Sequence, residues 1–143
     1  MSFFLFLNSQ DSAVFHSTNT ADDFTISLPK PYIMEGIWEC ALFEMSVSLR
    51  NDVSTSRIHI CTDVVEDSYV SNTMLPILRV VTLRPGRDFV ELTYQRPFYF
   101  DVCKQEIGRI RLFIRDEQLH PLHSNLRYFT CVLGFRKKGS WVP

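Results

Sequence analysis

The chain has 143 residues, a length typical of one domain, and 45% of them are hydrophobic while 22% are charged. This balance excludes a disordered segment, and no stretch approaches the roughly 18 apolar residues of a membrane-spanning helix. The formal net charge of −1 gives no general attraction to nucleic acid or anionic lipid, so we expect neither specific nucleic acid nor membrane as a partner. Twelve phenylalanines favour pleated, half-buried surfaces and therefore β structure.

The first residues, MSFFLFLNSQ, are apolar but lack the features of a signal peptide. No basic residue precedes the apolar run and no small-residue cleavage site follows it, so we interpret the segment as a first strand. The cysteines Cys40, Cys61, Cys103 and Cys131 are scattered, each in or beside an apolar segment. We expect buried, unpaired thiols of the kind usual in a reducing compartment, and therefore synthesis inside a cell.

Alternation of apolar and polar residues predicts about eight or nine short strands along the chain. After FFLFL, the segments with this pattern are DFTISL, WECALFEMSVSL, RIHIC, LRVVTL, FVELTY, RIRLFIRD and YFTCVLGFR. Helix signals are thin, because only residues 66–72 are compatible with a turn or two, and a loop fits them equally well. The LRPGRDF segment is the clearest hairpin signal, since Pro85 and Gly86 suit a tight turn.

Turns recur about every 8 to 14 residues, a spacing typical of a β-sandwich or a barrel. The chain contains no repeat of fixed period and no Gly/Ser linker. We therefore expect a single antiparallel all-β domain over residues 1–143, with residues 136–143 as an exposed C-terminal tail.

The histidines give only a weak indication of a metal site. His120 and His123 have H-x-x-H spacing, but Pro121 breaks the loop between them, and His16 and His59 are distant in sequence. Zinc sites usually contain closely paired ligands. We expect solvated loop histidines and no metal.

No catalytic motif stands out, since the chain lacks a G-x-S-x-G elbow, a glycine-rich phosphate loop and a G-K-[ST] sequence. Glu39 and Glu44 are a candidate carboxylate pair, but five positions apart on one strand they should project to opposite faces. Trp38, Cys40 and Leu42 should share the inward face. We expect no enzymatic activity and no cofactor, and we interpret both glutamates as sheet-surface or intersubunit contacts.

The segment FRKKGSWVP contains the basic cluster Arg136, Lys137 and Lys138, followed by Trp141. Two interpretations remain open. The charges are either solvated at the end of the last strand, or part of an arm that docks on a neighbouring subunit with Trp141 as its aromatic anchor.

Two further patterns concern the outer faces of the sheets. The arginines of RIRLFIRD form a stripe for which we expect ion pairs with acids on neighbouring strands. Phe43, Phe113 and Phe129 indicate a sheet that is apolar on both faces, which would favour an assembling subunit over a lone module.

Three segments together resemble structural proteins of Polinton/Maverick elements and their adintovirus relatives. The first, NTADDFTISLPKPYIMEGIWECALFEMS, resembles the N-terminal signature of that family. The matching positions are Asn19, Phe24, Leu28, Pro29, Gly36, Trp38, Glu39, Leu42 and Glu44. IHICTDVVEDSYVSNTMLPILRVV is similar to the family's middle stretch, and IGRIRLFIRDEQLHPL with CVLGFRKK resembles its final strands. Gly134 departs from the pattern, because another strand-favouring residue is common there.

The resemblance covers most of the chain and implies a single jelly-roll-like β-sandwich, a minor capsid or penton-type subunit of a virion. It implies a homo-oligomer, with a pentamer favoured, that also contacts other capsid proteins after synthesis in the host cytoplasm or nucleus. Arg136, Lys137, Lys138 and Trp141 would contribute to the subunit interface. The alternative is a non-enzymatic receptor- or glycan-binding β-domain of a virion fibre or surface protein.

Overall fold

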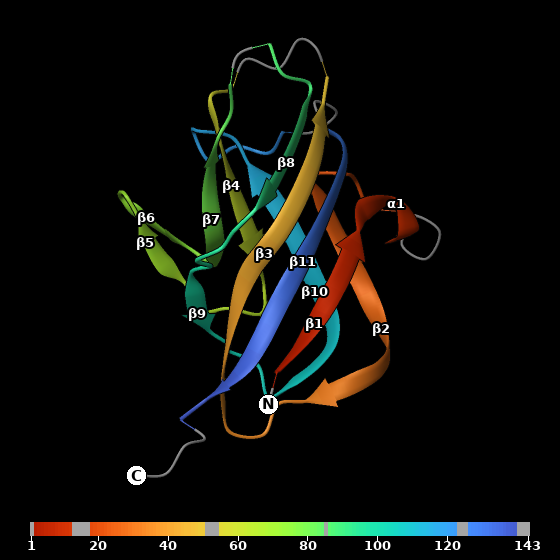
Figure 1. Ribbon diagram of the computed structural model, residues 1–143, viewed down its shortest axis with the longest axis vertical. Coiled ribbons are helices and arrows are strands. Elements are labelled where there is room, and N and C mark those ends of the chain that lie inside the picture. Colours follow the sequence, from red (N-terminus) through yellow and green to blue (C-terminus); the bar gives the residue numbers. More distant parts are fainter. Residues whose placement is uncertain (1, 13–17, 51–54, 85, 123–125, 140–143) are drawn as a thin grey trace.

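The computed structural model describes residues 2–12, 18–50, 55–84, 86–122 and 126–139. Two antiparallel sheets pack face to face, which confirms the expected all-β sandwich (Figure 1). Sheet 1 contains, in spatial order, β1 (Ser2–Asn8), β11 (Leu126–Lys138), β3 (Ile37–Leu49) and β8 (Phe89–Thr93), with β9 (Tyr99–Asp101) also beside β3. Sheet 2 contains β2 (Asp23–Ile33), β10 (Glu106–Arg115), β4 (Arg57–Thr62) and β7 (Ile77–Thr82).

The main core lies between the two sheets, and the alternating residues of the strands supply it. Phe24, Phe129 and Phe135 are its largest fully buried side chains. Fully buried aliphatic residues and a methionine from both sheets fill the space around these rings: Leu42, Met45, Ile58, Ile60, Leu78, Ile107, Ile110, Leu112 and Ile114. Each such burial is worth about 1.5–3 kcal/mol, so this alternation is the main source of stability.

A β-bulge interrupts the ladder between β3 and β11. Leu133 pairs with Leu42 and Val132 pairs with Glu44, so Phe43 is an extra residue on β3 without a partner in register. A bulge of this kind shifts the inward–outward alternation by one residue beyond it.

The bulge places two acids on the same side of the sheet. Before it, the core side of β3 carries the expected residues Trp38, Cys40 and Leu42, and after it the core side carries Met45, Val47 and Leu49. Glu39 and Glu44 therefore both lie on the face of sheet 1 that is turned away from sheet 2. The expectation that they would project to opposite faces was wrong, because simple alternation does not anticipate the extra residue.

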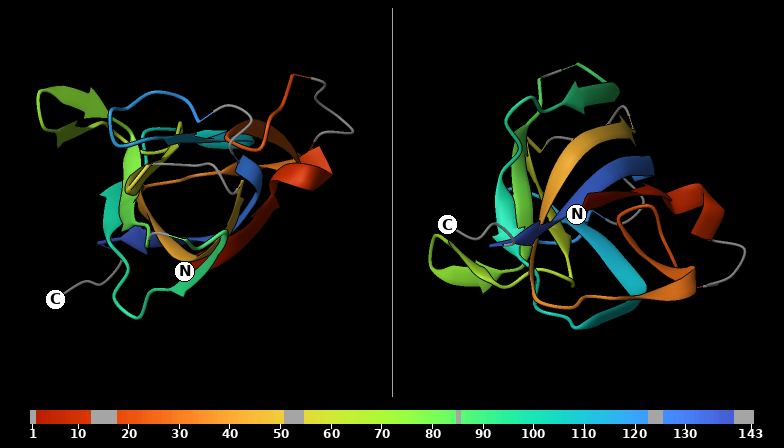
Figure 2. Two further views of the ribbon diagram at one scale, coloured as in Figure 1. Left: turned by 90° about the horizontal axis from the view of Figure 1, so that it is seen from above. Right: turned by 60° about the horizontal axis from the view of Figure 1, so that its bottom comes forward.

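Residues 66–72, the only helix candidate, contain no helix and contribute to a β-hairpin. Strands β5 (Ser68–Val70) and β6 (Thr73–Leu75) pair with each other and stand out from the sandwich in both views of Figure 2. Val70 and Leu75 of this hairpin pack on a small cluster on the outer face of sheet 2, formed by Cys61, Ile77 and Phe113. The hairpin therefore covers part of that face.

The predicted turn around Gly86 is present, but the hairpin prediction was wrong. Arg87 N–H donates to the Arg84 carbonyl at 3.4 Å, and Gly86 has φ of 79°. The flanking strands do not pair with each other, because β7 belongs to sheet 2 and β8 to sheet 1. Pro85 lies outside the described residues.

A short helix, α1 (Ser9–Ser12), follows β1. The Ser9 hydroxyl accepts a hydrogen bond of 3.0 Å from the Phe129 amide, which ties the helix start to β11. Across the described residues, no helix is both long enough and apolar enough to cross a membrane.

Candidate functional site

The outer face of sheet 1 exposes aromatic side chains that no other part of the described chain covers. Phe4 and Phe6 on β1 are 49% and 78% exposed. Phe43 lies beside them, with its ring centroid 5.2 Å from that of Phe4 in an edge-to-face arrangement, and Tyr99 follows at 6.2 Å from Phe43. Pairs at this separation and angle are favourable beyond their buried area. We call Phe4, Phe43 and Tyr99 the aromatic row.

A glycine makes room for this row. Phe43 lies on the outer face by the same alternation that turns Trp38, Cys40 and Leu42 to the core, and its ring lies over Gly134 on β11. A Cβ atom at Gly134 would lie 2.7 Å from Cδ1 of Phe43, closer than atoms in real proteins approach. The missing side chain at Gly134 therefore permits the Phe43 ring to occupy the space where a Cβ atom would otherwise be.

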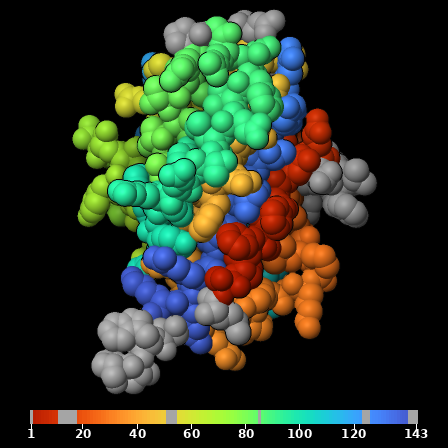
Figure 3. Space-filling view, viewed as in Figure 1, coloured from red at the N-terminus to blue at the C-terminus, as the bar shows by residue number. Residues whose placement is uncertain are grey.

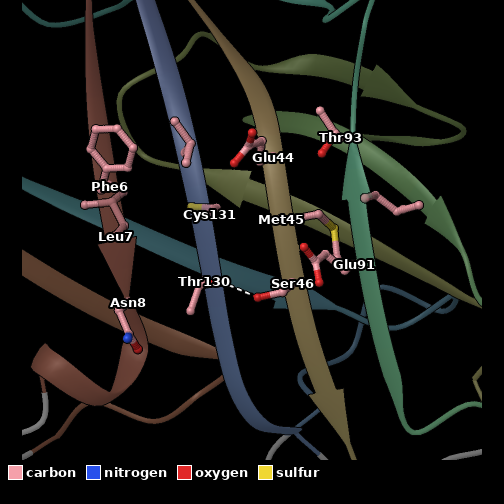
Figure 4. A pocket seen from close by; sticks show the side chains of 12 residues that line it. Phe6, Leu7, Asn8, Glu44, Met45, Ser46, Glu91, Thr93, Thr130 and Cys131 are labelled. Atoms are coloured by element: carbon pink, nitrogen blue, oxygen red, sulfur yellow. Dashed lines mark hydrogen bonds between the residues drawn. The ribbon is translucent and has the colours of Figure 1, made fainter.

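A hollow of about 390 Å³ lies next to the row on the same face, shown in Figure 4. Its floor contains Ser46 and Thr130, whose hydroxyls hydrogen-bond to each other across β3 and β11. Its rim contains the longer side chains of Phe6, Glu44 and Glu91. The hollow exists because the hydroxyl side chains of Ser46 and Thr130 are short, whereas the rim side chains around them are long.

The rim of the hollow is acidic. Glu44 and Glu91 lie on adjacent strands, since Glu44 pairs with Thr93 and Ser46 pairs with Glu91 in the ladder. Within the described residues neither carboxylate has a hydrogen-bond or ion-pair partner. The hollow thus combines an exposed ring, two carboxylates and several hydroxyls, a set that suits a neutral or cationic group.

The predicted interface residues Arg136, Lys137 and Lys138 are the last residues of β11 and pair in register with β3. These three residues therefore belong to the sheet and are not part of a tail; Trp141 lies outside the described residues. The Arg136 guanidinium donates to the Glu39 carboxylate and lies 3.4 Å from the ring centroid of Tyr99.

The other two cations of this cluster are also engaged with the chain. Lys138 forms an ion pair of 3.2 Å with Asp101. The Lys137 side chain lies against Gly36, where φ is 87°. The structure thus brings the basic cluster to one end of the aromatic row, beside acids of the same chain.

The arginine stripe of β10 behaves partly as predicted. Arg111 donates two hydrogen bonds to the Asp23 carboxylate on β2, at 2.8 and 2.7 Å, which confirms cross-strand pairing for this residue. Arg111 and Arg115 also lie over the Phe113 ring, at 4.3 and 4.8 Å from its centroid.

Three of the four cysteines are buried, as predicted, and are inert as nucleophiles. Burial raises the pKa of Cys61 to about 12 and raises the pKa values of Cys40 and Cys131 above their ordinary value. Thiols of this kind remain protonated at neutral pH. Cys103 departs from the prediction, because it is exposed.

The histidines do not converge. His59 is buried, with its Nδ1 atom 3.1 Å from the Asp116 carbonyl oxygen, and His120 is exposed. His16 and His123 lie outside the described residues. In the part of the chain that the structure describes, no group of three or more His, Cys, Asp or Glu side chains is placed to hold a metal ion.

The three phenylalanines expected on both sides of a sheet have three different environments. Phe129 is fully buried in the main core, and Phe113 is buried in the cluster beneath the hairpin. Phe43 alone contributes to an open apolar surface. The prediction therefore holds for Phe43 only, because Phe129 lies in the core between the sheets and the chain itself covers Phe113.

No protein-family model matches this chain, and no curated protein matches it either.

Proposed function

We propose that this protein is a structural subunit of a virion, a minor capsid or penton-type protein that assembles through protein contacts. The observation that carries the proposal is the open aromatic surface on sheet 1, where Phe4 and Phe6 are exposed beside Phe43 and Tyr99. Monomeric proteins rarely leave contiguous apolar surface of this kind uncovered, and such surface marks interaction sites. The resemblance of the sequence to Polinton/Maverick structural proteins supplies the viral setting.

The strand order supports a jelly-roll form of the sandwich. Eight strands follow the orders β1-β11-β3-β8 and β2-β10-β4-β7, so the chain changes sheet at most connections, and among these eight only β4 and β7 follow one another within one sheet. Two interleaved Greek keys produce such an order, and jelly rolls are recurrent in capsid and lectin domains.

In this proposal the subunit contacts copies of itself, with a pentamer favoured, and other capsid proteins. Arg136, Lys137, Lys138 and Trp141 contribute to the subunit contact, as the sequence analysis predicts. Individual contacts can be weak, because many act together in a closed shell. The proposal involves no cofactor, no membrane and no specific nucleic acid.

Light scattering of the purified protein over a wide concentration range tests the proposal. A fixed mass equal to a small multiple of 16.7 kDa, with a pentamer expected, would indicate a preformed building block. Deletion of residues 140–143 should weaken that oligomer without lowering the thermal unfolding temperature. A monomer at every concentration, with or without residues 140–143, would contradict self-assembly.

The hollow on sheet 1 favours a second candidate, a glycan-binding domain. An exposed aromatic ring next to hydroxyls and carboxylates offers one apolar and several polar contacts to a sugar, as small-molecule sites do. The two unpaired carboxylates favour neutral sugars over acidic ones. Neutral oligosaccharides should then perturb the NMR signals of Phe6 and Thr130, and the Phe6→Ala variant should bind more weakly than Phe98→Ala.

A further inference from the structure

Strand β1 forms an open edge of sheet 1. It pairs with β11 over all seven of its residues without a register shift, from Ser2 opposite Arg136 to Asn8 opposite Thr130. No other described segment forms a ladder or a backbone hydrogen bond with β1. Half of its backbone N–H and C=O groups therefore point away from the sheet without a ladder partner, and Figure 3 shows the strand at the surface in red.

The other sheet edges carry features that block pairing. On β2 the residues Pro29, Lys30 and Pro31 coincide with a break in the ladder to β10. On β7 the ladder to β4 is shifted near Ile60, and β8 is only five residues long and carries Glu91. Prolines, charges, bulges and short length are the usual protections of an edge strand. β1 has none of them.

The side chains of β1 permit it to pair with itself. The strand sequence SFFLFLN contains no charge, no proline and no glycine, so two copies can lie side by side without like-charge repulsion. We propose that β1 of one molecule pairs antiparallel with β1 of a second molecule, so that sheet 1 continues from one sandwich into the next. This contact goes beyond the capsid proposal and does not depend on it.

The alternation of β1 restricts the register of this pair. Phe4 and Phe6 lie on the outer face, and Phe3, Leu5 and Leu7 face the core, so opposite residues must have the same parity to keep both faces continuous. The register that pairs all seven residues places Ser2 opposite Asn8 of the second copy. Phe4 then lies opposite Phe6 of the second copy, and Phe6 opposite its Phe4, which continues the open aromatic surface across the contact.

Charge substitutions at Phe4 and Phe6 test both the contact and its register. The Phe4→Lys/Phe6→Lys variant places two introduced lysines opposite two others and should abolish the pair. The Phe4→Lys/Phe6→Glu variant places each introduced lysine opposite a glutamate and should retain it. Single substitutions Phe98→Lys and Tyr69→Lys, at exposed aromatic positions outside β1, serve as controls and should leave the mass unchanged.

Light scattering provides the readout. The mass of wild type and of the lysine–glutamate variant should be twice that of the double-lysine variant, with circular dichroism showing that all variants fold. The absolute mass of the double-lysine variant tests whether the protein forms the proposed pentamer. The ratio of the wild-type mass to the mass of that variant tests the β1 contact, so each hypothesis can fail on its own. Equal masses for all variants would overturn the β1 contact.

Hydrogen exchange gives an independent measurement on the same proteins. The amides of residues 2–8 should exchange more slowly in wild type than in the double-lysine variant, because a second ladder protects the groups that point away from β11. Equal exchange rates in β1, together with unchanged rates in β3, would also overturn the proposal.

Discussion

At Gly134 a side chain is excluded by a steric clash. Its φ is not in the left-handed region, so the requirement for glycine does not come from the backbone conformation. It comes from the Phe43 ring, which lies where a Cβ atom would be. That ring is itself held between Phe4 and Tyr99 and has little freedom to retreat.

We expect Gly134→Ala to lower the free energy of unfolding by about 1–3 kcal/mol, the usual cost of overpacking a fixed site. In a Phe43→Ala background the same substitution should cost much less, because the added methyl group then has room. Urea denaturation of the four proteins of this double-mutant cycle measures the coupling.

Gly108→Ala is the matched control for that cycle. A Cβ atom there would meet only Cγ of Pro31, at 3.9 Å, which is ordinary contact, and Gly108 also lies within a strand. An equal loss of stability for Gly108→Ala and Gly134→Ala would show that strand propensity, and not the Phe43 ring, determines the effect.

At the scale of the strands, alternation predicted most of the long elements from the sequence. The inward rows of β2, β10 and β4 matched the expected residues because one face of each sheet packs against the other sheet. The bulge at Phe43 escaped prediction, since the segment LFEMSV contains no glycine or proline to mark it. The turn at Gly86 was recognisable, but which sheet receives the next strand depends on contacts distant in sequence.

The candidate site was harder to predict from the sequence than the fold was. FFLFL is apolar at every position, so its pattern does not indicate which side chains face the core. The exposure of Phe4 and Phe6 follows from the position of β1 at the edge of sheet 1. Likewise, the acidic rim of the hollow depends on the shift that the bulge introduces at Glu44.

Glycine substitutions in the β5–β6 hairpin test which type of turn joins its two strands. Of the two central residues, only Ser71 has positive φ, 51°, as in a type II′ turn with its preference for glycine at the first position. Ser71→Gly should relieve left-handed strain and raise stability by about 0.5 kcal/mol after the entropic cost of glycine. Asn72→Gly should lower it instead, since no strain exists there. Amide exchange in β5 and β6 measures both effects, and the same sign for both variants would contradict this turn assignment.

At the scale of the whole molecule, the two outer faces differ in how much of their apolar surface the chain itself covers. On sheet 2 the hairpin covers Cys61, Ile77 and Phe113, and arginines lie over the Phe113 ring. On sheet 1 the described chain leaves Phe4 and Phe6 exposed, beside the half-buried rings of Phe43 and Tyr99. The two faces therefore differ: the chain covers the apolar cluster on the outer face of sheet 2, whereas the outer face of sheet 1 keeps exposed phenylalanine rings.

Three buried thiols predict how the stability of the molecule changes with pH: Cys40 and Cys131 in the main core, and Cys61 in the cluster on the outer face of sheet 2. The folded state raises the pKa of Cys61 from its ordinary value of 9.0 to about 12, and burial acts in the same direction on Cys40 and Cys131. Below pH 9 these thiols are protonated in both states, so their contribution is constant. Above it the unfolded chain releases protons that the folded chain retains, so stability falls as pH rises.

We therefore expect the free energy of unfolding, measured with urea, to decrease as the pH rises from about 9 toward 12, by up to about 1.4 kcal/mol per pH unit for each thiol in its window. Cys61→Ala should show a shallower decrease than wild type, because one of the shifted groups is gone. Cys103→Ala, at the exposed cysteine, should retain the wild-type slope. If Cys61→Ala and Cys103→Ala gave the same slope as wild type, alkaline destabilisation would have to come from other groups, of which Tyr94, whose pKa burial also raises, is the first to substitute.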